Sequence, residues 1–195
     1  MFLRPDLRLP ARSGRSAVWG WGRVLLPAVL LVAAAPAPTP AQQLLARVNA
    51  LRAAGIVCPA GAPLPSGAPV TPPPETGAGA RRPLTGTLTF SPLHAVAAFA
   101  QAKRMVQLSD VTHEGAGGST PQIRAAAAGI RADSVSEIVY LGRRGGVEGA
   151  ITWWRHSAVH CRVMTDPRYS VAGASVVAGP DGTAYVMVLT SVLHR

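Results

Sequence analysis

His160 and Cys161 are neighbours in the stretch SAVHCRVM, and the chain contains only 2 cysteines. A cysteine thiolate beside an imidazole can act as a nucleophile with its general base, and the same two side chains can bind a metal ion. A cysteine can also form a disulfide beside an unrelated histidine. From these residues alone, all three interpretations remain open.

Two further residues could act together with His160. His113 follows a predicted helix and Glu137 lies in the extended stretch SEIVY, so all three are at ends of predicted elements, where sites are commonly assembled. Two imidazoles and a carboxylate can hold a divalent ion such as zinc, whose bound water then becomes a nucleophile. The separations of 24 and 23 residues match no compact motif such as His-Glu-x-x-His, so spacing alone does not indicate a metal site.

The N-terminal residues 1–41 have the organisation of a secretory signal peptide. Arginines precede the apolar run VLLPAVLLVAAA, which is too short to span a bilayer stably, and small residues follow it. We expect cleavage after Ala41 and a mature chain of residues 42–195 that is secreted or periplasmic. An uncleaved N-terminal anchor is the alternative.

Composition excludes two kinds of partner for the mature chain. Removal of residues 1–41 lowers the formal charge from +10 to +6, and the remaining arginines are scattered without alternating aromatic residues. Nucleic-acid binding is therefore not expected. No later stretch has the eighteen apolar residues of a membrane helix, so we expect no membrane span after cleavage. The length fits one domain.

The order of predicted elements indicates an α+β fold. A capping residue followed by proline opens each of three predicted helices. The helices are expected over 41–55, 92–108, 121–128 and, without such a start, 147–157. Two β-rich runs, 169–178 and 183–192, are separated by Gly-Pro-Asp-Gly, which predicts an antiparallel hairpin. The Pro- and Gly-rich segment at about 59–83 is expected to be a surface loop.

Helical periodicity predicts which side chains are buried. In the helix over 92–108, we expect Leu93, Val96, Ala97 and Ala100 to form the buried stripe, and we place His94 at the surface. His156 and His194 are also expected at the surface. Trp153 and Trp154 are about 100° apart on a helix, so one should pack inward and the other lie near the surface.

Several segments, taken in order, resemble one known family. LLARVNALRAAGIVC is similar to its opening helix, and Met105 precedes His113 by the usual eight positions. WRHSAVHC matches the bacterial pattern Trp-x-x-Ser-x-x-His-Cys, with Trp154 first and Cys161 last. Over roughly residues 43–193 the chain resembles secreted bacterial members of the CAP superfamily (cysteine-rich secretory proteins, antigen 5 and pathogenesis-related proteins), whose domain is also called the SCP domain.

The resemblance implies an architecture and a site. It implies a three-layer α-β-α sandwich with a small antiparallel sheet. It also implies that His113, Glu137 and His160 meet in a cleft. Some relatives hold zinc in this cleft, and the corresponding ligands in this chain would be His113 and His160. The chain departs from the family where Gly-Glu-Asn has become Ser136-Glu137-Ile138. A second acid has no clear match, because Glu114 would point away from its neighbour His113 in an extended segment.

The resemblance also bears on the cysteines. Related bacterial sequences carry cysteines at the places of Cys58 and Cys161, and export exposes thiols to an oxidising compartment. We therefore expect a Cys58–Cys161 disulfide. It would close a loop of about a hundred residues, which the chain-entropy model values at roughly 4–5 kcal/mol.

The function expected from these features is that of an extracytoplasmic binding module and not of an enzyme. Its ligand would be a lipid, an envelope glycan or a protein. The alternative is a metal-assisted hydrolase with His113 and His160 as zinc ligands and Glu137 as general base. A cysteine peptidase is a third hypothesis, which a disulfide would exclude.

Overall fold

The computed structural model describes residues 36–60, 80–81 and 85–191. From Ala37 onward, the described residues belong to one compact unit. Most of the predicted signal peptide, the greater part of the Pro- and Gly-rich segment and His194 lie outside the described residues. The signal peptide therefore stays a prediction.

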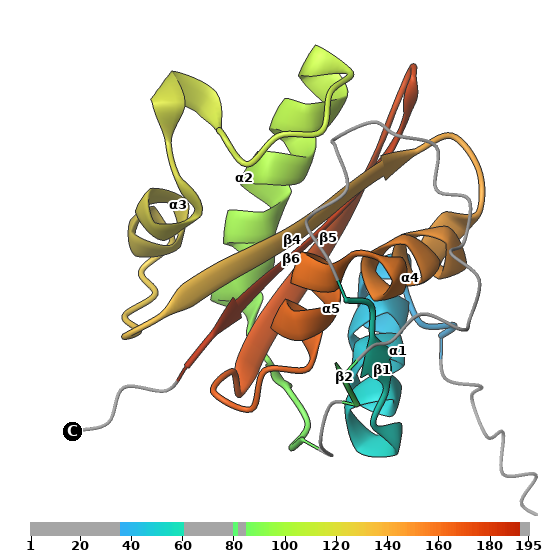
Figure 1. Ribbon diagram of the computed structural model, residues 1–195. Coiled ribbons are helices and arrows are strands. Elements are labelled where there is room, and N and C mark those ends of the chain that lie inside the picture. Colours follow the sequence, from blue (N-terminus) through green and yellow to red (C-terminus); the bar gives the residue numbers. More distant parts are fainter. Residues whose placement is uncertain (1–35, 61–79, 82–84, 192–195) are drawn as a thin grey trace, which may run out of the picture. The chain divides into compact units, whose positions relative to one another are not determined.

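The elements follow the predicted order of helices, an extended segment and a final hairpin (Figure 1). All four predicted helices are present, and the SEIVY segment is a strand. A further helix covers the SAVHCRVM segment from Ala158 onward, where the sequence analysis predicted none. The elements are α1 Pro40–Ala54, β1 Val57–Cys58, β2 Ala80–Arg81, β3 Thr89–Phe90, α2 Pro92–Leu108, the 3-10 turn η1 Ala116–Gly118, α3 Pro121–Ala127, β4 Val135–Gly142, α4 Gly146–His156, α5 Ala158–Met164, β5 Val171–Gly179 and β6 Gly182–Thr190.

A four-stranded sheet with the order β3-β5-β6-β4 forms the middle layer. The pairs β4–β6 and β5–β6 are antiparallel, as the predicted hairpin requires, and only the short β3 runs parallel to β5. A separate two-stranded ladder joins β1 to β2. In the register of β4 and β6, Glu137 is opposite Val188.

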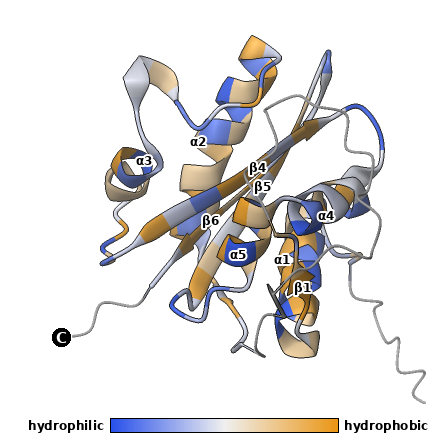
Figure 2. Ribbon diagram, in the orientation of Figure 1, coloured by the Kyte–Doolittle hydropathy of each residue, from blue (hydrophilic) through white to orange (hydrophobic). Residues whose placement is uncertain are grey.

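Helices cover both faces of this sheet. α2 and α3 lie on one face, and α1, α4 and α5 lie on the other (Figure 1). The strands carry mainly apolar residues and the turns between elements mainly polar ones (Figure 2). Alternate residues of β6 supply the two cores: Ala184, Val186 and Val188 face α2, and Tyr185, Met187 and Leu189 face the other layer. The predicted three-layer arrangement is confirmed.

α1 begins where the sequence predicts, at a proline preceded by a capping threonine. The Thr39 side chain accepts a hydrogen bond from the Gln42 backbone N–H at 3.3 Å, and the Gln42 side chain accepts one from the Thr39 backbone N–H at 2.7 Å. This reciprocal pair is a capping box. Gly55 ends the helix at φ 68°, a left-handed value that glycine adopts without strain. The helix thus crosses the predicted cleavage position.

The buried face of α2 differs from the predicted one. Leu93 and Val96 are 46% and 57% exposed, and Ala100 is exposed as well. Of the predicted stripe only Ala97 is buried. The face that packs on the sheet consists of small and polar residues around one methionine: His94, Ala97, Ala98, Gln101, Ala102 and Met105. The surface placement of His94 was therefore also wrong.

The sequence predicts no membrane span after residue 41. No helix among residues 36–60, 80–81 and 85–191 is both long and apolar enough to cross a bilayer.

Candidate functional site

Glu137 lies in β4 with its side chain on the sheet face covered by α2 and α3, since its cross-strand partner Val188 belongs to that core. The side chain is 0% exposed. One carboxylate oxygen accepts a hydrogen bond from His113 Nδ1 at 3.0 Å. The His113 side chain is 50% exposed, so it connects the buried carboxylate to the surface. The predicted approach of His113 to Glu137 is found in this structure.

Arg124 completes this group, although the sequence analysis did not single it out. Its Nη2 atom is 2.9 Å and 2.8 Å from the two Glu137 carboxylate oxygens. The same side chain donates to the backbone carbonyls of Ser119 at 2.6 Å and His113 at 3.1 Å. It is only 6% exposed. A buried carboxylate must be paired to remain charged, and Arg124 supplies that pairing.

α3 positions Arg124. The Thr120 side chain accepts a hydrogen bond from the Ile123 backbone N–H at 3.3 Å, and Pro121 occupies the first turn, as the Thr-Pro signal predicted. Arg124 is then one turn into the helix on the side that faces β4. In sequence, the only signal for its role is a single charged residue in the otherwise uncharged helix PQIRAAA.

His160 comes from the opposite layer of the fold, on α5. Its Nδ1 atom is 2.7 Å from the Ser157 hydroxyl, and its ring lies edge-on to Trp153 with centroids 4.6 Å apart. Burial, and to a smaller extent the charge of His113, lowers the pKa of His160 to about 4. His160 is therefore uncharged at neutral pH.

The three predicted site residues are thus not equally close. His113 and Glu137 are joined directly, whereas within the described segments no hydrogen bond connects His160 to either of them. The charge of His113 adds to the effect of burial in lowering the pKa of His160. His160 lies on α5, which contacts the edge strand β4 from the sheet face opposite to the Glu137 side chain.

The donor set does not fit a zinc ion. Among the residues that the structure describes, no three His, Cys, Asp or Glu side chains are grouped to hold a metal. Both Glu137 oxygens already face the Arg124 guanidinium, and that positive charge opposes a second cation. In this arrangement Arg124, and not a metal ion, is the cation that Glu137 contacts.

The cysteines answer the question raised by the His160–Cys161 pair. Cys58 and Cys161 form a disulfide with a Cα–Cα distance of 5.6 Å, as predicted, and no free cysteine remains in the chain. The bridge links β1 to α5 across 103 positions. A thiolate nucleophile is thereby excluded in the oxidised protein.

Several residues near the site have structural roles. Trp154 is fully buried and donates from its indole nitrogen to the Val139 carbonyl at 2.9 Å, while Trp153 is only partly buried, as the helical spacing predicted. His94 is 5% exposed, and its Nε2 atom is 2.8 Å from the Thr190 hydroxyl. Burial lowers the pKa of His94. Glu114 is exposed and takes no part in the group around Glu137.

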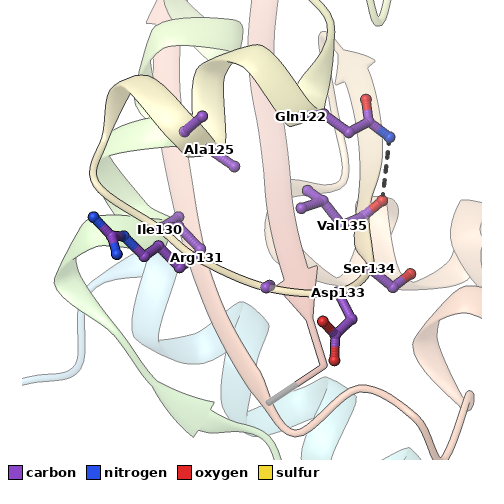
Figure 3. Close-up of a pocket in the computed structure, with 9 residues that line it drawn as sticks. Gln122, Ala125, Ile130, Arg131, Asp133, Ser134 and Val135 are labelled. Atoms are coloured by element: carbon purple, nitrogen blue, oxygen red, sulfur yellow. Dashed lines mark hydrogen bonds between the residues drawn. The ribbon is translucent and has the colours of Figure 1, made fainter. Parts of the chain in front are cut away.

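A hollow of about 570 Å³ lies between α3 and the connection to β4 (Figure 3). Gln122 points across it toward the start of β4 and donates to the Val135 carbonyl at 3.5 Å. Small residues such as Ala125 line much of it, and Arg131 and Asp133 lie at its margin, directed away from each other. The lining includes none of the predicted site residues.

Comparison with known proteins supports the fold. No protein-family model and no curated protein sequence matches the chain. Among solved structures, an outer surface protein of Borrelia burgdorferi matches with a TM-score of 0.51 and 16% identity, over 56% of this chain and 80% of that one. At 16% identity, this match shows a likeness of fold and nothing more. The predicted α+β fold is confirmed.

Two further solved structures match at TM-scores below 0.5. An extracellular protein containing an SCP domain, from Bacillus anthracis, matches with a TM-score of 0.49 and 17% identity, over 55% of this chain and 35% of that one. A cysteine-rich secretory protein from Staphylococcus aureus matches with a TM-score of 0.45 and 15% identity, over 55% and 33%. The chain thus spans about a third of the length of these two proteins.

Proposed function

We propose that this chain is an SCP-type binding protein that acts outside the cytoplasm and has no catalytic activity of its own. It would use the surface around His113 to bind an envelope ligand. The apolar N-terminal run supports export, and the names of the similar structures, extracellular or outer surface, agree with it. The fold likeness alone does not identify a function.

The observation that carries this proposal is the state of Glu137. A general base must reach the proton that it removes. The Glu137 side chain is 0% exposed and its carboxylate is already bonded to Arg124 and His113. With both cysteines in a disulfide, no free thiolate is available, and the Glu137 carboxylate is not accessible to a substrate. The half-exposed His113 ring can still form hydrogen bonds with a ligand.

The charge balance indicates what kind of ligand group would bind. Glu137 is neutralised by Arg124, and His160 is uncharged at neutral pH because its pKa is about 4. The buried part of the site therefore keeps little net charge. We expect an uncharged polar part of a lipid, glycan or protein to bind there, since burying a charged group without a partner costs free energy.

The test is a cosedimentation experiment on the purified exported protein. Three probes represent the candidate ligands: peptidoglycan sacculi, vesicles of phosphatidylethanolamine and phosphatidylglycerol, and detergent-solubilised envelope protein coupled to beads. Binding to one probe should weaken about tenfold in His113→Ala. His156→Ala is the matched control, because that ring bonds the Thr152 carbonyl of its own helix at 2.7 Å.

Two results would reject the proposal. One is the absence of binding to all three probes. The other is hydrolysis of an ester or amide substrate that is lost in His160→Ala, which would favour the hydrolase alternative.

A further inference from the structure

Arg124 occupies the position against the Glu137 carboxylate that a bound cation would need. We propose that Arg124 is the permanent cation of this site, so that the site works without a metal ion and presents the Nε2 atom of His113 as a hydrogen-bond acceptor for its ligand. The metal-free character depends on geometry alone. The acceptor role of His113 rests on the proposed binding function.

The hydrogen bonds of the guanidinium show how fully it satisfies the carboxylate. Its Nη2 atom lies within 2.9 Å of both Glu137 oxygens, as a cation bridging a carboxylate would. A metal ion approaching the same oxygens would meet a positive charge at hydrogen-bond distance. Arginine keeps its charge at every physiological pH, so this occupation is permanent.

The surrounding loop prevents Arg124 from moving aside. Its side chain donates to the carbonyls of His113 and Ser119, which lie at either end of the loop over 113–119. Between them, a Cβ atom added to Gly115 would be only 2.6 Å from Arg124 Nη1 and 3.2 Å from Gln101 Oε1. The loop backbone therefore packs directly on the guanidinium. Displacing Arg124 would require moving the segment that carries His113.

The same arrangement fixes the hydrogen of the His113 ring. An ionised carboxylate only accepts hydrogen bonds, so His113 Nδ1 must donate to Glu137. In the singly protonated ring, Nε2 is then an acceptor. Because the His113 side chain is 50% exposed, a hydroxyl or amide N–H of a ligand can reach that acceptor.

Zinc titration of the purified, untagged exported protein tests the proposal. By calorimetry and thermal unfolding, the wild type should show no saturable zinc site that depends on His113 and Glu137. Arg124→Met frees the carboxylate beside His113 and should raise zinc affinity at least about tenfold. Arg124→Lys keeps a positive charge beside Glu137 and should, like the wild type, show no such zinc site. Arg47→Met is the matched control, because Arg47 pairs with Glu148 at a surface where its side chain is 49% exposed.

Two results would overturn the proposal. The first is one zinc bound per wild-type chain and lost in both His113→Ala and Glu137→Gln. The second is equal zinc affinity in the wild type and a folded Arg124→Met. If Arg124→Met does not fold, nitrogen NMR of the wild-type His113 ring decides: the Nδ1–H form is expected, and the Nε2–H form contradicts the proposal. Failure of envelope binding with these results intact would reject the proposed function and with it the acceptor role of His113, but not the metal-free character of the site.

Discussion

The Arg52 guanidinium donates a hydrogen bond to the Met164 carbonyl oxygen at 2.9 Å, across 112 positions of sequence. Arg52 is 1% exposed. The same side chain also donates to the carbonyls of Gly86, Asp166 and Tyr169 at 2.6, 3.0 and 2.9 Å. One buried guanidinium thus joins α1 to the segment before β3 and to the connection between α5 and β5. Burial lowers the pKa of Arg52, and the charge of Asp166 opposes that shift.

Arg52→Met should therefore destabilise the protein strongly. It would leave the carbonyls of several distant segments buried without their donor, at a cost of about 3–5 kcal/mol. Arg52→Lys should recover only part of this, since one ammonium cannot reach the same carbonyls as the planar guanidinium. Urea unfolding measures both. A loss below about 1 kcal/mol, similar to that of the exposed Arg47→Met, would contradict the assigned role.

Gly173 shows a second constraint, the close approach of β5 to α2. A Cβ added at Gly173 would lie 2.6 Å from the Ser91 carbonyl oxygen and 2.7 Å from the His94 carbonyl carbon. These are backbone atoms, so α2 itself would have to move. We expect Gly173→Ala to cost about 1–3 kcal/mol in urea unfolding. Gly86→Ala is the control, because nothing lies within 4 Å of its added Cβ; equal losses in the two variants would contradict this interpretation.

That close approach explains why the sequence predicted α2 as a helix but assigned it the wrong buried face. α2 carries apolar residues on two sides. Leu93 and Val96, on the exposed side, are more hydrophobic than the alanines on the buried side. Where α2 comes so close to β5, small residues such as Ala97 and Ala98 pack against the sheet, and Leu93 and Val96 point away from it. Helical periodicity reports which faces are apolar, but the spacing between α2 and the sheet is a tertiary property.

The candidate site, like α2, was predicted only in part from the sequence. The family resemblance, and not the spacing of residues, led to the prediction that His113, Glu137 and His160 lie together, and the structure joins only the first two by a hydrogen bond. The lone charge in the helix PQIRAAA was not enough to predict the role of Arg124, because an arginine in a short helix is usually solvated and its burial depends on the loop that wraps it. α5 was missed because a helix of only 7 residues has a weak periodic signal.

The outward face of α2 provides a direct test of this orientation. Phe99 is 51% exposed, whereas Met105 on the other face is fully buried. Phe99→Ser should change the free energy of unfolding by less than about 1 kcal/mol, and Met105→Ala should cost about 2–5 kcal/mol. Thermal unfolding of the two variants measures the difference. The reverse order would place the originally predicted stripe in the core.

Reduction of the disulfide should lower stability without removing the fold. The Cys58–Cys161 bond closes a loop with a sequence separation of 103, so its removal should cost about 2–5 kcal/mol. The double variant Cys58→Ser with Cys161→Ser should unfold at the same urea concentration as the reduced wild type. Equal midpoints for oxidised and reduced wild type would show that the bond does not constrain the unfolded chain.

The last prediction concerns pH and follows from His160. Its pKa is about 4 in the folded protein and ordinarily 6.5, so the unfolded chain binds the extra proton more readily. The contribution of this ring to stability is therefore complete above about pH 6.5 and is lost as the pH falls from 6.5 toward 4. The loss should amount to at most about 3 kcal/mol.

His160→Asn separates this effect from other titrations. The asparagine amide can replace Nδ1 as the partner of the Ser157 hydroxyl, 2.7 Å away in the wild type, but it does not titrate. Urea unfolding at pH 7.5 and pH 4.5 should therefore differ less in the variant than in the wild type. Some dependence should persist, because burial also lowers the pKa of His94. An unchanged difference in His160→Asn would mean that the His160 ring is solvated and exchanges its proton freely, in conflict with its packing against Trp153.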